Sequence, residues 1–205
     1  MKLFYSPGAC SLGTHVLLEE IGAPYELALI NLREGQQFSP EFRAVNPKGK
    51  VPALLRDDGS VLTEFQAIAF WLASRFPEAG LIPEDLEGQT RVLELLDYIV
   101  GSVHMRGFTL FIAPQKFVQN DGAQGELREA GQKAVSDGLN SLSNALGDKS
   151  YFFGDFTITD AAAFYLTHWA TMLDVALPDN LAAFENRMMA RPAVAAALAQ
   201  ETASA

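Results

Sequence analysis

Residues 1–22, MKLFYSPGACSLGTHVLLEEIG, predict a short strand, a tight turn and an amphipathic helix in immediate succession. The run KLFYS is apolar and aromatic, as strands are, and Pro7 and Gly8 close it with a turn. The next apolar residues recur at helical spacing, and Gly22 offers the left-handed residue on which many helices end. The only cysteine of the chain, Cys10, therefore lies where the turn passes into the helix.

The sequence up to residue 76 repeats these signals in an order typical of a small α+β domain. YELALINL predicts a second strand, and PEFRAVNPKGK predicts a helical turn that ends in a Pro-Gly loop. VPALLRDDGSVLTE predicts two strands joined at Asp58-Gly59, which is a strong hairpin signal. FQAIAFWLASRF then follows as a helix, so the expected order is βαβ, loop, ββα.

Residues 77–86, rich in proline and glycine, predict a linker, and strand signals vanish beyond it. Helical periodicity extends over 87–118 and 125–146, and three further helices are expected before the chain ends. The predicted architecture is therefore an α+β domain at 1–76, the linker at 77–86, and an all-helical domain at 87–205.

The stretch FTITDA at residues 156–161 has the pattern of a helix N-terminus. Thr157 precedes Asp160 by three residues, which allows each side chain to bond the backbone of the other, as in a capping box in its aspartate form. Asp160 is therefore expected to be structural rather than catalytic.

Composition excludes several classes of function. The 205 residues carry a net charge of −10, which disfavours nucleic acids and anionic membranes as main partners. One cysteine permits neither an internal disulfide nor a zinc ribbon, and no metal site is expected. No apolar run reaches the ~18 residues of a membrane span, and the apolar stretch before Cys10 is too short for an export signal. We expect a cytoplasmic protein.

Cys10 is the first candidate for chemistry. The free N–H groups and the dipole of a helix N-terminus favour an anion, so a thiolate there is expected to have a depressed pKa. The same groups would also suit the sulfur of a bound thiol. The alternative is that Cys10 is a small buried filler.

Two later stretches offer groups for a peptide-like ligand. Val51 precedes Pro52 and must be extended. If the peptide bond between them is cis, the backbone of Val51 turns outward and can pair with a ligand in strand fashion; the alternative is a strand that merely begins at Pro52. Glu64 lies between a strand and a helix N-terminus, which suits a ligand that is an amino acid. The alternative there is a first-turn glutamate that only complements the helix dipole. His104 lies in the long helical stretch, and its spacing assigns it no partner.

Taken together, these features resemble the glutathione transferases, most closely the bacterial beta class. The matching stretches are MKLFYSPGACS at the N-terminus, NPKGKVPAL at 46–54, LTE with AI at 62–68, VH at 103–104 and FTITDA at 156–161. The resemblance spans nearly the whole chain. It implies a thioredoxin-like N-terminal domain, an all-α C-terminal domain and a two-fold homodimer.

The resemblance also implies roles for the matching positions. Cys10 would face the glutathione sulfur and form a mixed disulfide with it, with His104 near that sulfur. Val51, before a cis Pro52, would pair with the cysteinyl unit of glutathione. Glu64 and the backbone of Phe65 would bind the γ-glutamyl end, and Asp97 would reach that end across a dimer interface. Ser11 and, ranked below it, Tyr5 are reserve candidates for activating the sulfur.

Two departures from the family pattern concern glutathione binding. Phe65 replaces the usual small residue, which removes a hydroxyl contact and adds bulk. The loop after the second strand reads REGQQ and lacks the family's lysine, so Arg33 or Lys48 is expected to replace it near the glycyl carboxylate.

The leading hypothesis is an enzyme that conjugates the glutathione thiolate to small apolar electrophiles, with Met105, Phe108 and Phe111 lining the second-substrate pocket. An alternative is a glutathione-dependent thiol–disulfide oxidoreductase that uses Cys10 in a monothiol route. A third is a non-catalytic binding protein with the transferase fold, suggested by the two departures. The sequence does not identify the electrophile.

Overall fold

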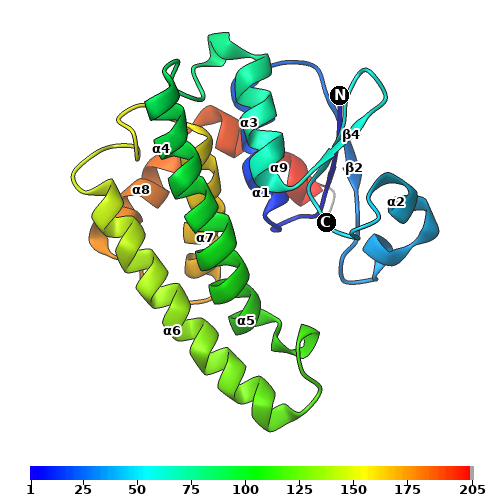
Figure 1. Ribbon diagram of the computed structural model, residues 1–205, viewed down its shortest axis with the longest axis vertical. Coiled ribbons are helices and arrows are strands. Elements are labelled where there is room, and N and C mark those ends of the chain that lie inside the picture. Colours follow the sequence, from blue (N-terminus) through cyan, green and yellow to red (C-terminus); the bar gives the residue numbers. More distant parts are fainter. Residues whose placement is uncertain (204–205) are drawn as a thin grey trace. The chain divides into compact units, whose positions relative to one another are not determined.

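The computed structural model describes residues 1–203, and they form two compact units (Figure 1). Of the described residues, the first unit contains Met1–Glu84 together with residues 187–203, and the second contains Asp85–Asn186. We expected the helical domain to extend to the end of the chain. In the structure the last helix groups instead with the N-terminal unit, because it packs along the first helix.

A four-stranded mixed sheet is the centre of the first unit. The strand order is β2-β1-β3-β4, in which β1 and β2 are parallel and the other neighbours are antiparallel. This arrangement confirms the predicted βαβ and ββα halves, since a parallel pair requires a crossover helix and the antiparallel pair only a tight turn. The strands are β1 (Lys2–Tyr5), β2 (Glu26–Leu29), β3 (Ala53–Leu55) and β4 (Val61–Thr63).

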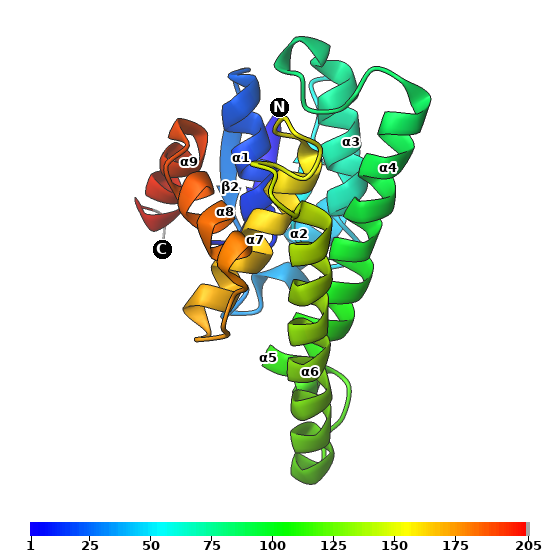
Figure 2. The ribbon, with the colours of Figure 1, turned by 90° about the vertical axis from the view of Figure 1, so that its left-hand side faces the viewer.

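Helices cover both faces of this sheet (Figure 1). Phe4 packs against Phe42 of α2, with ring centroids 5.8 Å apart, while the buried Leu3 and Tyr5 point to the opposite face by strand alternation. On that opposite face α1 contacts both α3 and α9, and Figure 2 shows α9 beside α1. The helices are α1 (Ser11–Ile21), η1 (Gln36–Phe38), α2 (Pro40–Val45), α3 (Phe65–Arg75), η2 (Pro77–Ala79) and α9 (Pro192–Ala203).

The second unit is helical, as predicted, but its first long stretch is not one α-helix. It begins as α4 (Leu86–Asp97) and continues as η3 (Tyr98–Phe108), which has the wider π-helical bonding; the amide of Thr109, for example, bonds the carbonyl of His104. Helical periodicity did not reveal this change. The stretch ends before Pro114, as proline predicts. The other helices are α5 (Thr109–Ile112), η4 (Pro114–Lys116), α6 (Asp121–Leu146), α7 (Ile158–Met172) and α8 (Asp179–Met189).

Two glycines let α6 approach η3 and α5 closely, and Figure 2 shows these segments side by side. A Cβ atom on Gly131 would lie 2.4 Å from the backbone nitrogen of Phe111. A Cβ atom on Gly138 would lie 2.8 Å from a methyl group of Val103. The glycines therefore set the packing of the segment that contains His104. None of the helices in the described part of the chain is long and apolar enough to span a membrane.

The capping box at the start of α7 is present as predicted. Asp160 is fully buried and accepts hydrogen bonds from the amides of Thr157 (2.8 Å) and Phe152 (3.0 Å), and from the Thr157 hydroxyl (3.0 Å). Its carboxylate thus fixes both the helix N-terminus and the preceding loop, which is a structural role.

Asp160 should make stability depend on pH. Burial raises its pKa from 3.8 to about 6, against the hydrogen bonds that lower it. The folded state therefore binds a proton here more readily, so this contribution is full below about pH 4 and is lost as the pH rises through 6. A shift of about two units corresponds to about 3 kcal/mol. When the pH is lowered from about 7 to about 4, the free energy of unfolding of wild type should rise by about 3 kcal/mol relative to that of Asp160→Asn. Urea unfolding of both proteins at the two pH values measures this difference. A difference that is the same at both pH values would contradict this assignment.

Candidate functional site

Cys10 lies at the N-cap of α1, where the sequence placed it. Its Sγ is 3.5 Å from the carbonyl oxygen of Val51 and donates a hydrogen bond to it. The Val51–Pro52 peptide bond is cis, as the resemblance implied. The structure therefore brings together two of the predicted site residues, which are 41 positions apart in the chain.

Ser11 has little freedom to act on a ligand. Its side chain is fully buried, and its hydroxyl accepts from the amide of Ser6 at 3.1 Å and donates to the carbonyl of Ser6 at 3.2 Å. These two bonds fix the start of residues 6–10, which we call the Cys10 loop. Tyr5, the other reserve group, is 1% exposed in β1. Ser11 therefore stabilises the loop and Tyr5 packs in the core beside the sheet, so both have structural roles.

The expectation of a depressed pKa at Cys10 was wrong. Burial raises the pKa of the Cys10 thiol from 9.0 to about 12. The amides of Cys10 and Ser11 and the charge of Lys50 lower it, and Glu64 raises it, but desolvation is the largest of these effects. Cys10 is therefore a neutral thiol at pH 7, and the helix N-terminus is left as a set of donors for another anion.

Glu64 occupies a strained position at the start of α3. Its φ of 72° and ψ of 126° are rare for a residue with a side chain, and such strain clusters at functional sites. The Lys48 ammonium lies 2.6 Å from the Glu64 carboxylate and also donates to the Thr63 hydroxyl at 2.9 Å. Phe65 is 4% exposed and lies in the core, so its ring packs inside the protein and does not add the bulk that we expected at the binding site.

Sequence reasoning missed two residues in the loop at 46–50. Asn46 is buried; its amide donates to the carbonyl of Lys50 at 2.7 Å, and its oxygen accepts from the amide of Lys48 at 3.1 Å. It thereby shapes the loop between α2 and Val51. The charge of Lys50 lowers the pKa of Cys10. The Asn-Pro turn signal and the position next to Val51 were the available clues.

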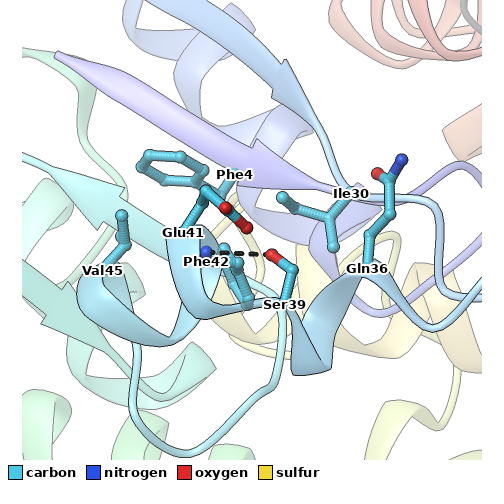
Figure 3. Close-up of a pocket in the computed structure, with 7 residues that line it drawn as sticks. All are labelled: Phe4, Ile30, Gln36, Ser39, Glu41, Phe42 and Val45. Atoms are coloured by element: carbon cyan, nitrogen blue, oxygen red, sulfur yellow. Dashed lines mark hydrogen bonds between the residues drawn. The ribbon is translucent and has the colours of Figure 1, made fainter.

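The loop after β2 holds Arg33, which is exposed and whose amide donates to the Asn31 side chain at 3.1 Å. A hollow of about 360 Å³ opens beside this loop, under α2 (Figure 3). Its polar rim includes Ser39, whose hydroxyl already accepts from the amide of Phe42. The lining residues are Phe4, Ile30, Gln36, Ser39, Glu41, Phe42 and Val45.

The remaining candidates lie in the second unit. His104 is partly buried in η3, with Nδ1 3.3 Å from the Tyr165 hydroxyl and its ring edge-on to Trp169 at 4.9 Å. Phe108 is fully buried and packs on Trp169 at 5.5 Å, so the expectation that it lines a substrate pocket gives way to a core role. The other three differ in exposure: Met105 and Asp97 are exposed, and Phe111 is partly exposed.

No group of three or more His, Cys, Asp and Glu side chains within residues 1–203 is arranged to hold a metal ion. The groups that the described site offers to a ligand are a thiol, backbone amides, two lysines and a carboxylate. These groups suit a zwitterionic ligand that contains sulfur.

Comparisons with known proteins show the family of this chain. The family described as "Glutathione S-transferase, N-terminal domain" matches residues 8–75, and "Glutathione S-transferase, C-terminal domain" matches residues 135–192. Glutathione S-transferase GstA of Escherichia coli O157:H7 is 37% identical over 206 residues, covering 98% of each chain. This chain belongs to the glutathione S-transferase family.

Solved glutathione S-transferases share the fold. The bacterial beta class enzyme of Sphingomonas chungbukensis is 34% identical, with a TM-score of 0.84 over 98% of both chains. A sphingomonad glutathione S-transferase complexed with glutathione is 33% identical, with a TM-score of 0.84 over 98% of this chain and 99% of that one. The thioredoxin-like N-terminal domain and the helical C-terminal domain are those of the glutathione S-transferases.

Proposed function

We propose that this chain conjugates the thiolate of glutathione to small apolar electrophiles. The observation that supports this most strongly is the match to glutathione S-transferases along 98% of the chain, one of them solved with glutathione, combined with the meeting of Cys10 and Val51. The third hypothesis, a binding protein without activity, loses part of its basis because Phe65 is buried.

The sulfur of glutathione would lie at the N-terminus of α1. The amides of Cys10 and Ser11 face the Cys10 sulfur and lower its pKa, so they are oriented to stabilise a second sulfur anion nearby. Cys10 is a neutral thiol and would donate its hydrogen bond to that anion instead of to the carbonyl oxygen of Val51. The enzyme would thus lower the pKa of the bound thiol and hold it toward the electrophile.

The γ-glutamyl end would bind at Glu64, with its ammonium on the carboxylate and its carboxylate at the N-terminus of α3. Glu64 is paired with Lys48 in the free protein, so the ligand ammonium would replace Lys48 there. Lys48 would then be available to a ligand carboxylate, and Arg33 is a second cation for the glycyl end.

The other assignments follow from the family resemblance. We propose that His104 acts near the sulfur, that Met105 and Phe111 contact the electrophile, and that Asp97 reaches the γ-glutamyl end of a second copy in a homodimer. The same resemblance suggests a cytoplasmic bacterial protein in detoxification, able to form a mixed disulfide between Cys10 and glutathione.

Calorimetric titration with glutathione, followed by an assay with a chloronitrobenzene electrophile, tests the proposal. We expect binding and glutathione-dependent release of chloride with formation of a thioether. The absence of binding up to millimolar glutathione would favour the non-catalytic alternative.

Glu64→Gln should weaken glutathione binding about 10- to 100-fold, because a hydrogen bond between charged groups contributes about 1.5–3 kcal/mol. Its matched control is Glu26→Gln, which likewise removes one exposed ion pair, to Lys2 at 2.9 Å. Because both ion pairs are exposed and screened by solvent, neither loss should change stability appreciably. Equal affinity of wild type and Glu64→Gln in calorimetry would place the γ-glutamyl end elsewhere.

A further inference from the structure

A buried carboxylate on the last helix contacts the loop that leads to Cys10. Glu201 of α9 is 3% exposed, and its Oε2 accepts a hydrogen bond from the amide of Gly8 at 2.9 Å. The two residues are 193 positions apart in the chain. Gly8 is two residues before Cys10, in the turn that closes β1.

The same carboxylate also contacts the helix that follows Cys10. Its Oε1 lies 3.3 Å from Nδ1 of His15, which is fully buried in α1. The opposite ring nitrogen of His15 lies 3.1 Å from the Gln200 side-chain oxygen, and Gln200 in turn donates to Glu19 at 2.8 Å. Helical spacing around His15 gives no sign of these contacts, because both partners lie about 185 positions further along the chain.

Glu201 therefore contacts both the loop that precedes Cys10 and the helix α1 that follows it. The loop before Cys10 is held at Ser6 by the Ser11 hydroxyl and at Gly8 by Glu201. The helix after Cys10 is held at His15 by the other oxygen of the same carboxylate. The amides of Cys10 and Ser11 lie between these points, so their direction depends on both. Buried polar networks whose members are all paired select one conformation.

We propose that Glu201 is a positioning residue, which holds the Cys10 loop in register with the N-terminus of α1 so that the amides of Cys10 and Ser11 face the ligand sulfur. The inference rests on the proposed function, since it assigns those amides to glutathione. It extends that function to a residue on the last helix that touches no part of the proposed ligand site.

Two variants of Glu201 test this role. Glu201→Ala removes both contacts, and we expect kcat/KM for glutathione to fall about tenfold and alkylation of Cys10 by iodoacetamide at pH 8 to become at least fivefold faster, because the loop no longer buries the thiol. Glu201→Gln keeps an acceptor for Gly8 and a donor for His15, and it should stay within about twofold of wild type in both measurements.

Arg191→Met is the matched control. The Arg191 guanidinium joins the start of α9 to α1 through both oxygens of Glu20, at 2.7 and 2.9 Å, and Glu20 lies in the last turn of α1, at the opposite end from Cys10. Its loss should reduce stability while leaving kcat/KM and the alkylation rate at wild-type values. If Glu201→Ala does not fold, Glu201→Asp, whose shorter side chain cannot hold both contacts, is measured in its place. Should neither fold, amide exchange of Gly8 in wild type decides, and an unprotected Gly8 amide would overturn the proposal.

The outcomes separate this inference from the proposed function. If wild type is active but Glu201→Ala has the same kcat/KM and the same alkylation rate, the positioning role alone is overturned. Equal changes of these two quantities in Glu201→Ala and Arg191→Met would also overturn it. Wild type without any glutathione-dependent activity would overturn the proposed function. The alkylation rate of Cys10 still tests the loop in that case, because it needs no glutathione.

Discussion

Gly131→Ala should destabilise the helical unit by about 3–5 kcal/mol or prevent its folding. The added Cβ would meet the backbone of α5 at 2.4 Å (Phe111 nitrogen) and 2.8 Å (Leu110 carbonyl carbon), and backbone atoms inside a packed unit cannot move aside as a side-chain tip can. A loss of that size is exceptional for one methyl group and indicates a close backbone contact.

The matched control for this prediction lies in the same helix. A Cβ on Gly125 would meet no atom within 4 Å, so Gly125→Ala should stabilise α6 by about 0.5–1 kcal/mol through helix propensity. Urea unfolding of both variants measures the contrast. Similar small effects of the two substitutions would show that α6 does not approach α5 as closely as described.

Cys10→Ala should abolish thiol transfer, since no other cysteine exists in the chain, while conjugation should fall only about tenfold. In the proposed mechanism Cys10 supplies one hydrogen bond to the glutathione thiolate, while the α1 amides remain. Because S–H is a weak donor, the loss of this bond costs about 1.5 kcal/mol, the low end for a hydrogen bond to a charged group. Cys10→Ser retains a donor, so its conjugation rate should stay within about threefold of wild type, with thiol transfer still at background.

The two activities are measured on the same preparations, with a chloronitrobenzene for conjugation and a mixed disulfide of a small thiol for transfer. Loss of conjugation in both Cys10→Ala and Cys10→Ser, with glutathione binding intact, would contradict the donor role. It would instead make the Cys10 sulfur the essential nucleophile and favour the oxidoreductase alternative.

Local signals were sufficient to predict most of the fold. The strand, turn and helix of residues 1–22, the Asp58-Gly59 hairpin and the Thr157-Asp160 capping box each depend on neighbours in the chain, and each is present. The π-helical bonding of η3 was not predictable from periodicity, because it accompanies the close approach of α6 at Gly131 and Gly138.

The site was predicted less completely, for a related reason. The family resemblance implied that Cys10 and Val51 both contact the cysteinyl unit of glutathione, and the structure places them in contact with each other. The pKa of Cys10 depends on how much protein surrounds its sulfur, and no local sequence pattern indicates that. The helix N-terminus lowers that pKa as expected, but desolvation exceeds it. Glu201 escaped notice because its two contacts join residues 193 and 186 positions away.

The most direct test of the account is a pH titration of thiolate absorbance in wild type and in Cys10→Ser, each with and without glutathione. The account predicts no thiolate in free wild type below about pH 9, because burial raises the pKa of its single cysteine to about 12. It also predicts one thiolate per bound glutathione, in both proteins, at least one pH unit below the ~8.5 of a free thiol. A thiolate in free wild type at pH 7, or bound glutathione that ionises as it does in water, would contradict it.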